Sequence, residues 1–238
     1  MNAVLTESQA REEICRIGKS LFDRGYVHAT AGNISVRLDA SQGGGFLITP
    51  TDACLGQLDP ARLARLDHQA QQTGGDRASK TIALHARIYC ASALFDEKTS
   101  CIIHTHGSAC VAASLQPAQQ VGAQQPELLP ALTPYFVMKV GHVPLIPYHR
   151  PGDPQAAERV AQIIGQYGAS GTPIRAVMLE RLGPNVWHDS PAAAMATLEE
   201  LEETARLWQQ CRASGQPLPV PLTELQIDEL RRTSGARW

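Results

Sequence analysis

Two histidines, His104 and His106, close the apolar segment "SCIIHTH" and stand directly before Gly107. Side chains alternate between the two faces of a β-strand, so both imidazoles should project from the same face. Two imidazoles in this arrangement can chelate one divalent metal ion, as in many zinc sites. The alternative is a pair of hydrogen-bonded surface histidines, but an apolar strand that ends at the pair favours the metal site.

Two further segments contain groups that suit an anion. In "HATAGNISVRL", Gly32 and Asn33 lie at a loop-to-strand turn, where backbone N–H groups can point at a ligand. In "ITPTDAC", Thr49 and Thr51 follow a predicted strand, so hydroxyls and backbone donors lie near a second turn. Either segment alone would also fit an ordinary tight turn.

The segment "RASKTIALH" predicts the start of a helix, with Ser79 as its N-cap and Lys80 in its first turn. A helix N-terminus carries free N–H groups and a positive dipole, so a hydroxyl and an ammonium there suit a phosphate. The alternative for Lys80 is a solvated surface lysine. Thr81 and His85 are four residues apart and should share one face of this helix.

The composition indicates a globular protein that acts on small molecules. Apolar residues make up 43% of the 238 residues and the formal charge is −2, which gives no indication of a nucleic-acid or membrane surface. The six cysteines show no CxxC pair, the N-terminus has no apolar signal core, and no run is long enough to span a bilayer. We therefore expect reduced thiols and a cytoplasmic location.

Helices and strands should alternate along the chain. We expect helices at about 7–25, 80–93, 107–115, 153–168, 190–212 and 223–232, and strands in "NISVRL", "GFLITP", "ARLARLD", "TSCIIHTH", "HVPLIPY", "IRAVMLE" and "PNVWH". Thr6, Asp153 and Ser190 are the expected N-caps, and 116–126 reads as a surface loop. The acidic run from Glu199 to Glu203 is interpreted as a solvated helix face. This alternation predicts one layered α/β domain over residues 1–238.

The order of these segments resembles the class II aldolase/adducin-like family: an early G-N-x-S, an "ITPT" strand end, a serine at a helix start, then H-x-H. The resemblance runs from about Glu7 to Arg212. It implies a central mixed β-sheet flanked by helices on both faces, and a homotetramer with active sites between subunits. It also implies a substrate-phosphate site at five positions: Gly32, Asn33, Thr51, Ser79 and Lys80. Lys80 replaces the second serine of the family pair, and Asp52 stands where a glycine is usual.

The resemblance further implies a divalent metal ion, with Zn²⁺ the first expectation, bound by His104, His106 and a later histidine before a glycine. This chain has Leu182 at that later position, which departs from the family pattern. Glu180, two residues earlier on the same predicted strand, is the candidate third ligand; a structural ion pair is the alternative. His149 and His188 are weaker candidates.

A second departure concerns the acid/base glutamate of the family's aldolases, because Thr81 occupies its position. Threonine cannot take a substrate proton at neutral pH, which argues against aldol cleavage. The loss of CO₂ from a 3-oxo acid needs no prior proton abstraction. It needs stabilisation of the enolate, which a divalent metal ion can supply, and a proton donor. Tyr135 matches a family tyrosine that reaches a neighbouring subunit's site and could be that donor; a core tyrosine is the alternative.

Within the family, "SKTIALHARIY", "PYHRPGD" and "ERLGPNVW" are most similar to the 3-oxo-tetronate 4-phosphate decarboxylases. The resemblance implies a carboxy-lyase that forms dihydroxyacetone phosphate and CO₂ from a phosphorylated sugar acid. Lys80, His85 and Arg150 are candidates to hold phosphate or carboxylate, and Lys80, Thr81, His85 and Tyr135 are the candidate catalytic residues. One alternative is a sugar-phosphate aldolase or 4-epimerase with another base. The other is an adducin-like scaffold without a metal site.

Overall fold

Eight strands form one sheet in the order β4-β3-β2-β1-β5-β8-β7-β6 in the computed structural model, which describes residues 5–116 and 126–238. All neighbouring strands are antiparallel except β6 and β7, which are parallel, so the predicted mixed sheet is confirmed. The strands are β1 Asn33–Arg37, β2 Phe46–Ile48, β3 Ala64–Leu66, β4 Gln72–Gly74, β5 Cys101–His104, β6 Leu145–Ile146, β7 Ala176–Leu179 and β8 Gly183–His188. The loop predicted at 116–126 lies mostly outside the described residues.

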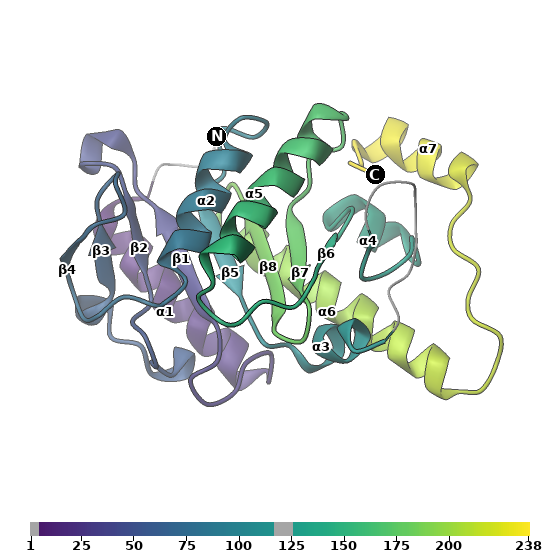
Figure 1. The fold of residues 1–238 in the computed structure, drawn as a ribbon, viewed down its shortest axis with the longest axis horizontal. Coiled ribbons are helices and arrows are strands. Elements are labelled where there is room, and N and C mark those ends of the chain that lie inside the picture. Colours follow the sequence, from purple (N-terminus) through teal and green to yellow (C-terminus); the bar gives the residue numbers. More distant parts are fainter. Residues whose placement is uncertain (1–4, 117–125) are drawn as a thin grey trace.

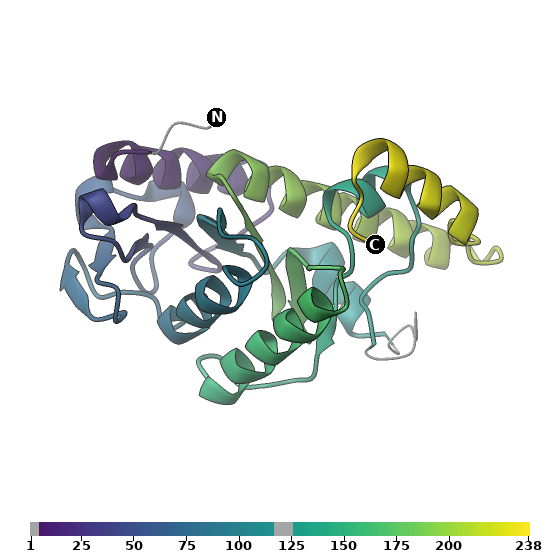
Figure 2. The same cartoon turned by 90° about the horizontal axis from the view of Figure 1, so that it is seen from above.

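Helices cover both faces of the sheet, as the edge-on view in Figure 2 shows. Figure 1 labels them: α1 Glu7–Asp23, α2 Ile82–Ser92, α3 Ser108–Ser114, α4 Pro134–Lys139, α5 Pro154–Ala169, α6 Pro191–Ala213 and α7 Glu224–Ser234. Side chains of α1, α3, α4, α6 and α7 share one apolar core with Ile34, Ile103 and Val186 of the sheet. Helices α2 and α5 form a second core with Ile102 and Trp187. Consecutive residues of β5 thus enter opposite cores, as expected for a strand buried on both faces.

The predicted N-caps explain where the longest helices begin. The Thr6 hydroxyl accepts a hydrogen bond from the Gln9 N–H in a complete capping box, and Asp153 and Ser190 cap α5 and α6 in front of Pro154 and Pro191. The sequence analysis did not predict two short elements, β4 and α4. Thr133 is the N-cap of helix α4, and its hydroxyl accepts a hydrogen bond from the Phe136 N–H.

The predicted start of α2 is wrong by two residues. The helix begins at Ile82 rather than at Lys80, and Thr81 rather than Ser79 is its N-cap. The reason is tertiary, because the segment before it pairs with the chain that leaves β2. The Ser79 N–H donates to the Thr49 carbonyl at 3.2 Å and the Thr51 N–H donates to the Arg77 carbonyl at 2.8 Å. These contacts keep Ser79 and Lys80 outside the helix.

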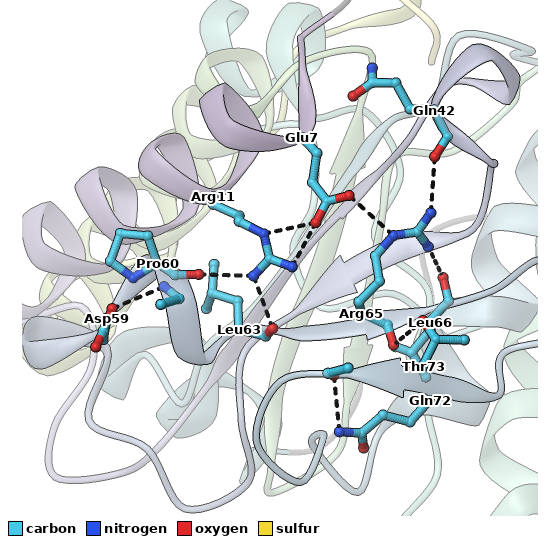
Figure 3. Close-up of polar contacts among 12 residues, drawn as sticks. Glu7, Arg11, Gln42, Asp59, Pro60, Leu63, Arg65, Leu66, Gln72 and Thr73 are labelled. Atoms are coloured by element: carbon cyan, nitrogen blue, oxygen red, sulfur yellow. Dashed lines mark hydrogen bonds and ion pairs between the residues drawn. The ribbon is translucent and has the colours of Figure 1, made fainter.

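An ion-pair cluster fastens α1 to the outer strands of the sheet (Figure 3). Arg11 donates to Glu7 and to the carbonyls of Pro60 and Leu63, at 2.8 Å and 3.1 Å for the two carbonyls. The other Glu7 oxygen lies 3.5 Å from Nε of Arg65 on β3. Because Arg11 and Arg65 are largely buried and share Glu7, the cluster orients α1 across this edge.

All six cysteines are free, in agreement with the reduced thiols that were predicted. Cys101 and Cys110 are fully buried, and burial raises the pKa of both thiols well above the usual value. These two thiols therefore serve as small core side chains. None of the helices in the described ranges is long and apolar enough to cross a membrane.

The packing of α2 against the sheet generates a stability prediction. Ile88 is completely buried in the α2/α5 core, so Ile88→Ala should lower the free energy of unfolding by about 2–5 kcal/mol. Leu94, just past α2, is 76% exposed, and Leu94→Ala should change it by less than about 0.5 kcal/mol. Urea unfolding monitored by circular dichroism measures both. Equal effects of the two substitutions would contradict the assigned core.

Candidate active site

A cavity of about 200 Å³ opens where β5 ends and β1 begins. Its wall brings together eight of the residues predicted from the sequence: Gly32, Asn33, Thr51, Ser79, Lys80, Thr81, His104 and His106. Leu182 and, from the loop before α5, His149 and Arg150 complete much of the remaining wall. The segments that were singled out separately in the sequence thus line a single site.

The register of the sheet explains this convergence. Asn33 is the first residue of β1 and pairs with His104, the last residue of the antiparallel strand β5. Directly paired residues point to the same face, which here is the face covered by α2 and α5. The chain leaving β2 adds Thr51, and the segment before α2 adds Ser79 to Thr81. Because the cavity lies at the ends of the central strands, the apolar cores on both faces of the sheet remain continuous.

His104 and His106 lie next to each other, with ring centroids 5.0 Å apart. Strand β5 ends at His104, so His106 lies just beyond the strand rather than on it as predicted. Nδ1 of His104 lies 2.9 Å from the Pro184 carbonyl. Because a carbonyl only accepts, Nδ1 carries the proton and Nε2 keeps a free lone pair. A metal-binding histidine is usually oriented by a hydrogen bond of this kind.

Both imidazoles are neutral at physiological pH. Burial, with a smaller contribution from His106, lowers the pKa of His104 to about 3. Burial, followed by the nearby His28, also lowers the pKa of His106 below its usual value. Neutral imidazole is the form that binds a metal ion, so the protonation state of the pair suits one.

The residues around the pair fit a divalent ion with two protein imidazoles, but they supply no third ligand of the usual type. Among residues 5–116 and 126–238, no group of three or more His, Cys, Asp or Glu side chains is placed to hold a metal ion. Leu182 lines the cavity at the position of the family histidine. The buried Asn33 Oδ1 has no hydrogen-bond partner and lies in the same wall, so it is an available oxygen donor.

The expectation that Glu180 and Leu182 share one strand is wrong. Strand β7 ends at Leu179, and the chain turns through Arg181, which has φ +65°, before β8 begins at Gly183. The Glu180 carboxylate accepts a hydrogen bond from the Tyr148 N–H at 3.0 Å and lies 3.4 Å from Nε of Arg181. Glu180 is absent from the residues that line the cavity. Its carboxylate is therefore engaged in joining the β7–β8 turn to the chain after β6.

The side of the cavity that the sequence predicts to bind an anion contains hydroxyls and one exposed ammonium. Oγ of Ser79 and Oγ1 of Thr81 are 3.0 Å apart, and Nζ of Lys80 lies 3.9 Å from the Asp52 carboxylate. Asp52 has φ +57°, the left-handed region that favours glycine, which accounts for the glycine usual at this position. Thr49 is completely buried, and its hydroxyl accepts from the Ile34 N–H, so it supports the strand pairing rather than lining the cavity.

His85 lies behind the cavity wall. It is completely buried, and its Nδ1 lies 2.7 Å from the Ser35 hydroxyl, which also contacts the Tyr89 hydroxyl at 2.8 Å. Burial, with a smaller contribution from His104, lowers the pKa of His85 to about 3. Its buried Nε2 has no partner. A neutral imidazole in this place cannot neutralise a phosphate, but it can support the wall next to His104.

Two other candidates, Tyr135 and His188, lie away from the cavity, and a third, His149, lies in its wall. Tyr135 is on α4 and is 62% exposed, so it is not a core tyrosine. His188 ends β8 at the opposite end from the cavity and pairs with Asp189 at 2.7 Å. His149 lines the cavity but lies 3.5 Å from Asp153, the N-cap of α5.

One residue near the site was missed by the sequence analysis. Asn185 pairs directly with His104 across β5 and β8, is completely buried, and has no hydrogen-bond partner for either side-chain atom. The asparagine in "GPNVW" could not be predicted as a site residue from the sequence, because only the pairing register of β5 and β8 places it opposite His104. Together with the Asn33 oxygen and Nε2 of His85, it surrounds His104 with unpaired polar groups.

The chain has close relatives among proteins of known function. It is 49% identical to the 3-oxo-tetronate 4-phosphate decarboxylase of Cupriavidus necator over 98% of this chain and 99% of that protein. It is 38% identical to the enzyme of the same name from Escherichia coli K12, over 84% of this chain and 86% of the relative.

A solved structure extends the likeness to three dimensions. The crystal structure of YgbL from Escherichia coli, named as an aldolase/epimerase/decarboxylase, superposes with a TM-score of 0.78 at 35% identity. The superposition covers 94% of this chain and 99% of that one. Residues 12–209 match the family described as Class II Aldolase and Adducin N-terminal domain. The strand order, the cavity and these matches agree, and the chain belongs to the class II aldolase and adducin family.

Proposed function

We propose that the protein is a 3-oxo-tetronate 4-phosphate decarboxylase, a carboxy-lyase that forms dihydroxyacetone phosphate and CO₂. The 49% identity to a decarboxylase of that name over nearly the whole of both chains carries the proposal. The cavity supports it independently, because Thr81 occupies the place of the aldolase base within a wall that keeps the histidine pair and the phosphate-binding positions.

The reaction breaks the C1–C2 bond of the substrate. The bonding electron pair passes into an enolate at C2, C3 and the keto oxygen, and a proton then adds to C2. No base has to remove a proton before the bond breaks, so a threonine at position 81 is compatible with the reaction. When bound at His104 and His106, a divalent ion, which we propose is Zn²⁺, supplies positive charge near the keto oxygen.

The chain's own residues hold the two ends of the substrate. We assign the phosphate to Gly32, Asn33, Thr51, Ser79 and Lys80, where hydroxyls, backbone N–H groups and an ammonium converge. Arg150 lines the same wall, and we propose that it holds the carboxylate before it leaves. Leu179 and Leu182 make part of the wall apolar, which favours loss of a charged carboxylate as neutral CO₂.

The reaction also needs a proton donor to C2. We propose Tyr135, because it is exposed on α4 and because the family resemblance implies a tyrosine that reaches the site of a neighbouring subunit in a homotetramer. A hydroxyl contributed across a subunit interface would explain why a large aromatic side chain is kept in solvent in the single chain. We also propose a cytoplasmic location, which the free cysteines support.

Turnover of 3-oxo-tetronate 4-phosphate generated in situ tests the function. We expect equal amounts of dihydroxyacetone phosphate and CO₂, loss of turnover with a chelator, and recovery with Zn²⁺.

His104→Ala and His106→Ala should each lose bound metal and reduce kcat at least about 100-fold, because a ligand is removed. The control His188→Ala, far from the cavity, should keep both. Full activity of a metal-free histidine variant would reject the metal-assisted mechanism, and sugar-phosphate cleavage without CO₂ would favour an aldolase.

Lys80→Ala should chiefly weaken binding of the phosphorylated substrate. A charge-assisted hydrogen bond to phosphate contributes about 1.5–3 kcal/mol, so KM should rise about 10- to 100-fold while kcat changes little. Lys98→Ala removes another exposed lysine outside the cavity and should leave KM unchanged. Steady-state kinetics of both variants measures the difference. An unchanged KM in Lys80→Ala would reject the assignment of Lys80 to the phosphate.

Leu182→His should restore a third imidazole to the cavity wall. Because Leu182 lines the same cavity as His104 and His106, we expect Zn²⁺ to bind at least about 10-fold more tightly. Competition against a chromogenic chelator measures this affinity. Leu182→Met, which keeps an apolar side chain of similar volume, is the control. Equal Zn²⁺ affinities of the two variants would mean that position 182 cannot contribute a ligand in this chain.

A further inference from the structure

A carboxylate from the long helix α6 contacts the chain immediately after His106. Oε1 of Glu202 accepts a hydrogen bond from the Ala109 N–H at 2.7 Å, and Oε2 accepts one from the Cys110 N–H at 3.1 Å. Both N–H groups belong to the first turn of α3, where they have no partner within the helix. The carboxylate therefore joins two elements that are about 90 residues apart in the sequence.

Helix α3 needs this contact because it lacks a cap of its own. Its N-cap residue is Gly107, which has no side chain to accept a hydrogen bond. The glycine also leaves room for the Glu202 carboxylate, since a Cβ at position 107 would lie 2.4 Å from its Oε2 and would displace it. Glu202 thus takes the place of the missing cap, and its negative charge suits the N-terminus of a helix.

The neighbouring acidic residues of α6 do not take part. Glu199 pairs with Arg24, Glu203 pairs with Arg206, and Glu200 accepts from the Thr204 hydroxyl at 3.2 Å. The interpretation of 199–203 as a solvated face therefore fails for Glu202, which reaches α3 instead of solvent. This difference within one acidic run indicates a specific role.

The other side of the histidine pair is held by β8. A Cβ at Gly183 would lie only 1.9 Å from the Thr105 carbonyl, and the Pro184 carbonyl accepts from Nδ1 of His104. His104 is thereby fixed through its own ring. Within residues 5–116 and 126–238, the ring of His106 has no hydrogen bond of this kind and packs only edge-on against the ring of His104. Its position therefore depends on the backbone between Thr105 and the first turn of α3.

We propose that Glu202 is a positioning residue that fixes His106 in the cavity by anchoring α3. The inference rests on the proposed function, because it assumes that His106 takes part in metal binding and turnover. Without the carboxylate, two N–H groups of α3 lose their acceptors and the Gly107 hinge becomes free to rotate. The imidazole of His106 then samples several positions, which weakens chelation even when the fold persists.

Zn²⁺ affinity and kcat of folded Glu202 variants test this role. Glu202→Ala removes both acceptors, and we expect at least about a 10-fold loss of Zn²⁺ affinity with a fall in kcat and little change in KM. Glu202→Gln keeps one acceptor oxygen and should recover part of the loss. Glu200→Gln, two residues away on the same helix, is the matched control and should behave like the wild type. All measurements are made well below the melting temperature of each variant.

Three outcomes separate the possibilities. If Glu202→Ala lowers only the melting temperature while Zn²⁺ affinity and kcat per folded molecule stay unchanged, Glu202 is purely structural and the inference is overturned. If Glu202→Gln is as impaired as Glu202→Ala, the charge rather than the remaining acceptor carries the effect, and anchoring through hydrogen bonds is rejected. If the wild type neither binds Zn²⁺ nor turns over, the proposed function fails and the inference fails with it.

Discussion

The close contact between the end of β5 and the start of β8 determines where the catalytic groups lie. The Thr105 carbonyl approaches Gly183 so closely that any side chain there would overlap it, and Gly183 has φ +149°. The next residue, Pro184, has no N–H to donate, but its carbonyl is free to accept from Nδ1 of His104. This dipeptide thus stands where β5 and β8 cease to pair, sets the tautomer of His104 and leaves the lone pair of Nε2 free.

The layered architecture leaves few other places for such a site. Both faces of β5 are covered by apolar cores, so a polar side chain within the strand would lose hydrogen bonds to water. At the strand end, the cores give way to loops that provide N–H groups and hydroxyls. Directly behind the site, the buried Ser35 hydroxyl forms hydrogen bonds with both His85 and Tyr89. These three side chains form a small polar region between the cavity and the apolar core that α2 and α5 make with the sheet.

Local patterns predicted the elements well, because caps and apolar periodicity act over a few residues. Thr6, Asp153 and Ser190 cap helices as expected, and the H-x-H, G-N and S-K segments converge on one cavity. The predictions from the sequence fail where contacts between residues far apart in the chain determine the structure. Pairing with the chain after β2 delays the start of α2, a turn removes Glu180 from the cavity wall, and strand register alone places Asn185. Glu202 has the same local pattern as its acidic neighbours, so its contact with α3 could not be predicted from the sequence.

The two departures from the family pattern are chemically consistent with each other. An aldolase needs a base to begin cleavage, and Thr81 removes it; a decarboxylase generates its enolate by the loss of CO₂ itself. Leu182 removes one imidazole and makes the wall less polar, which disfavours a bound carboxylate relative to CO₂. Burial lowers the pKa of His104 and of His106, so both imidazoles suit a metal ion better than the role of a cationic acid. The proton donor proposed above, Tyr135, is separate from this pair and exposed on α4.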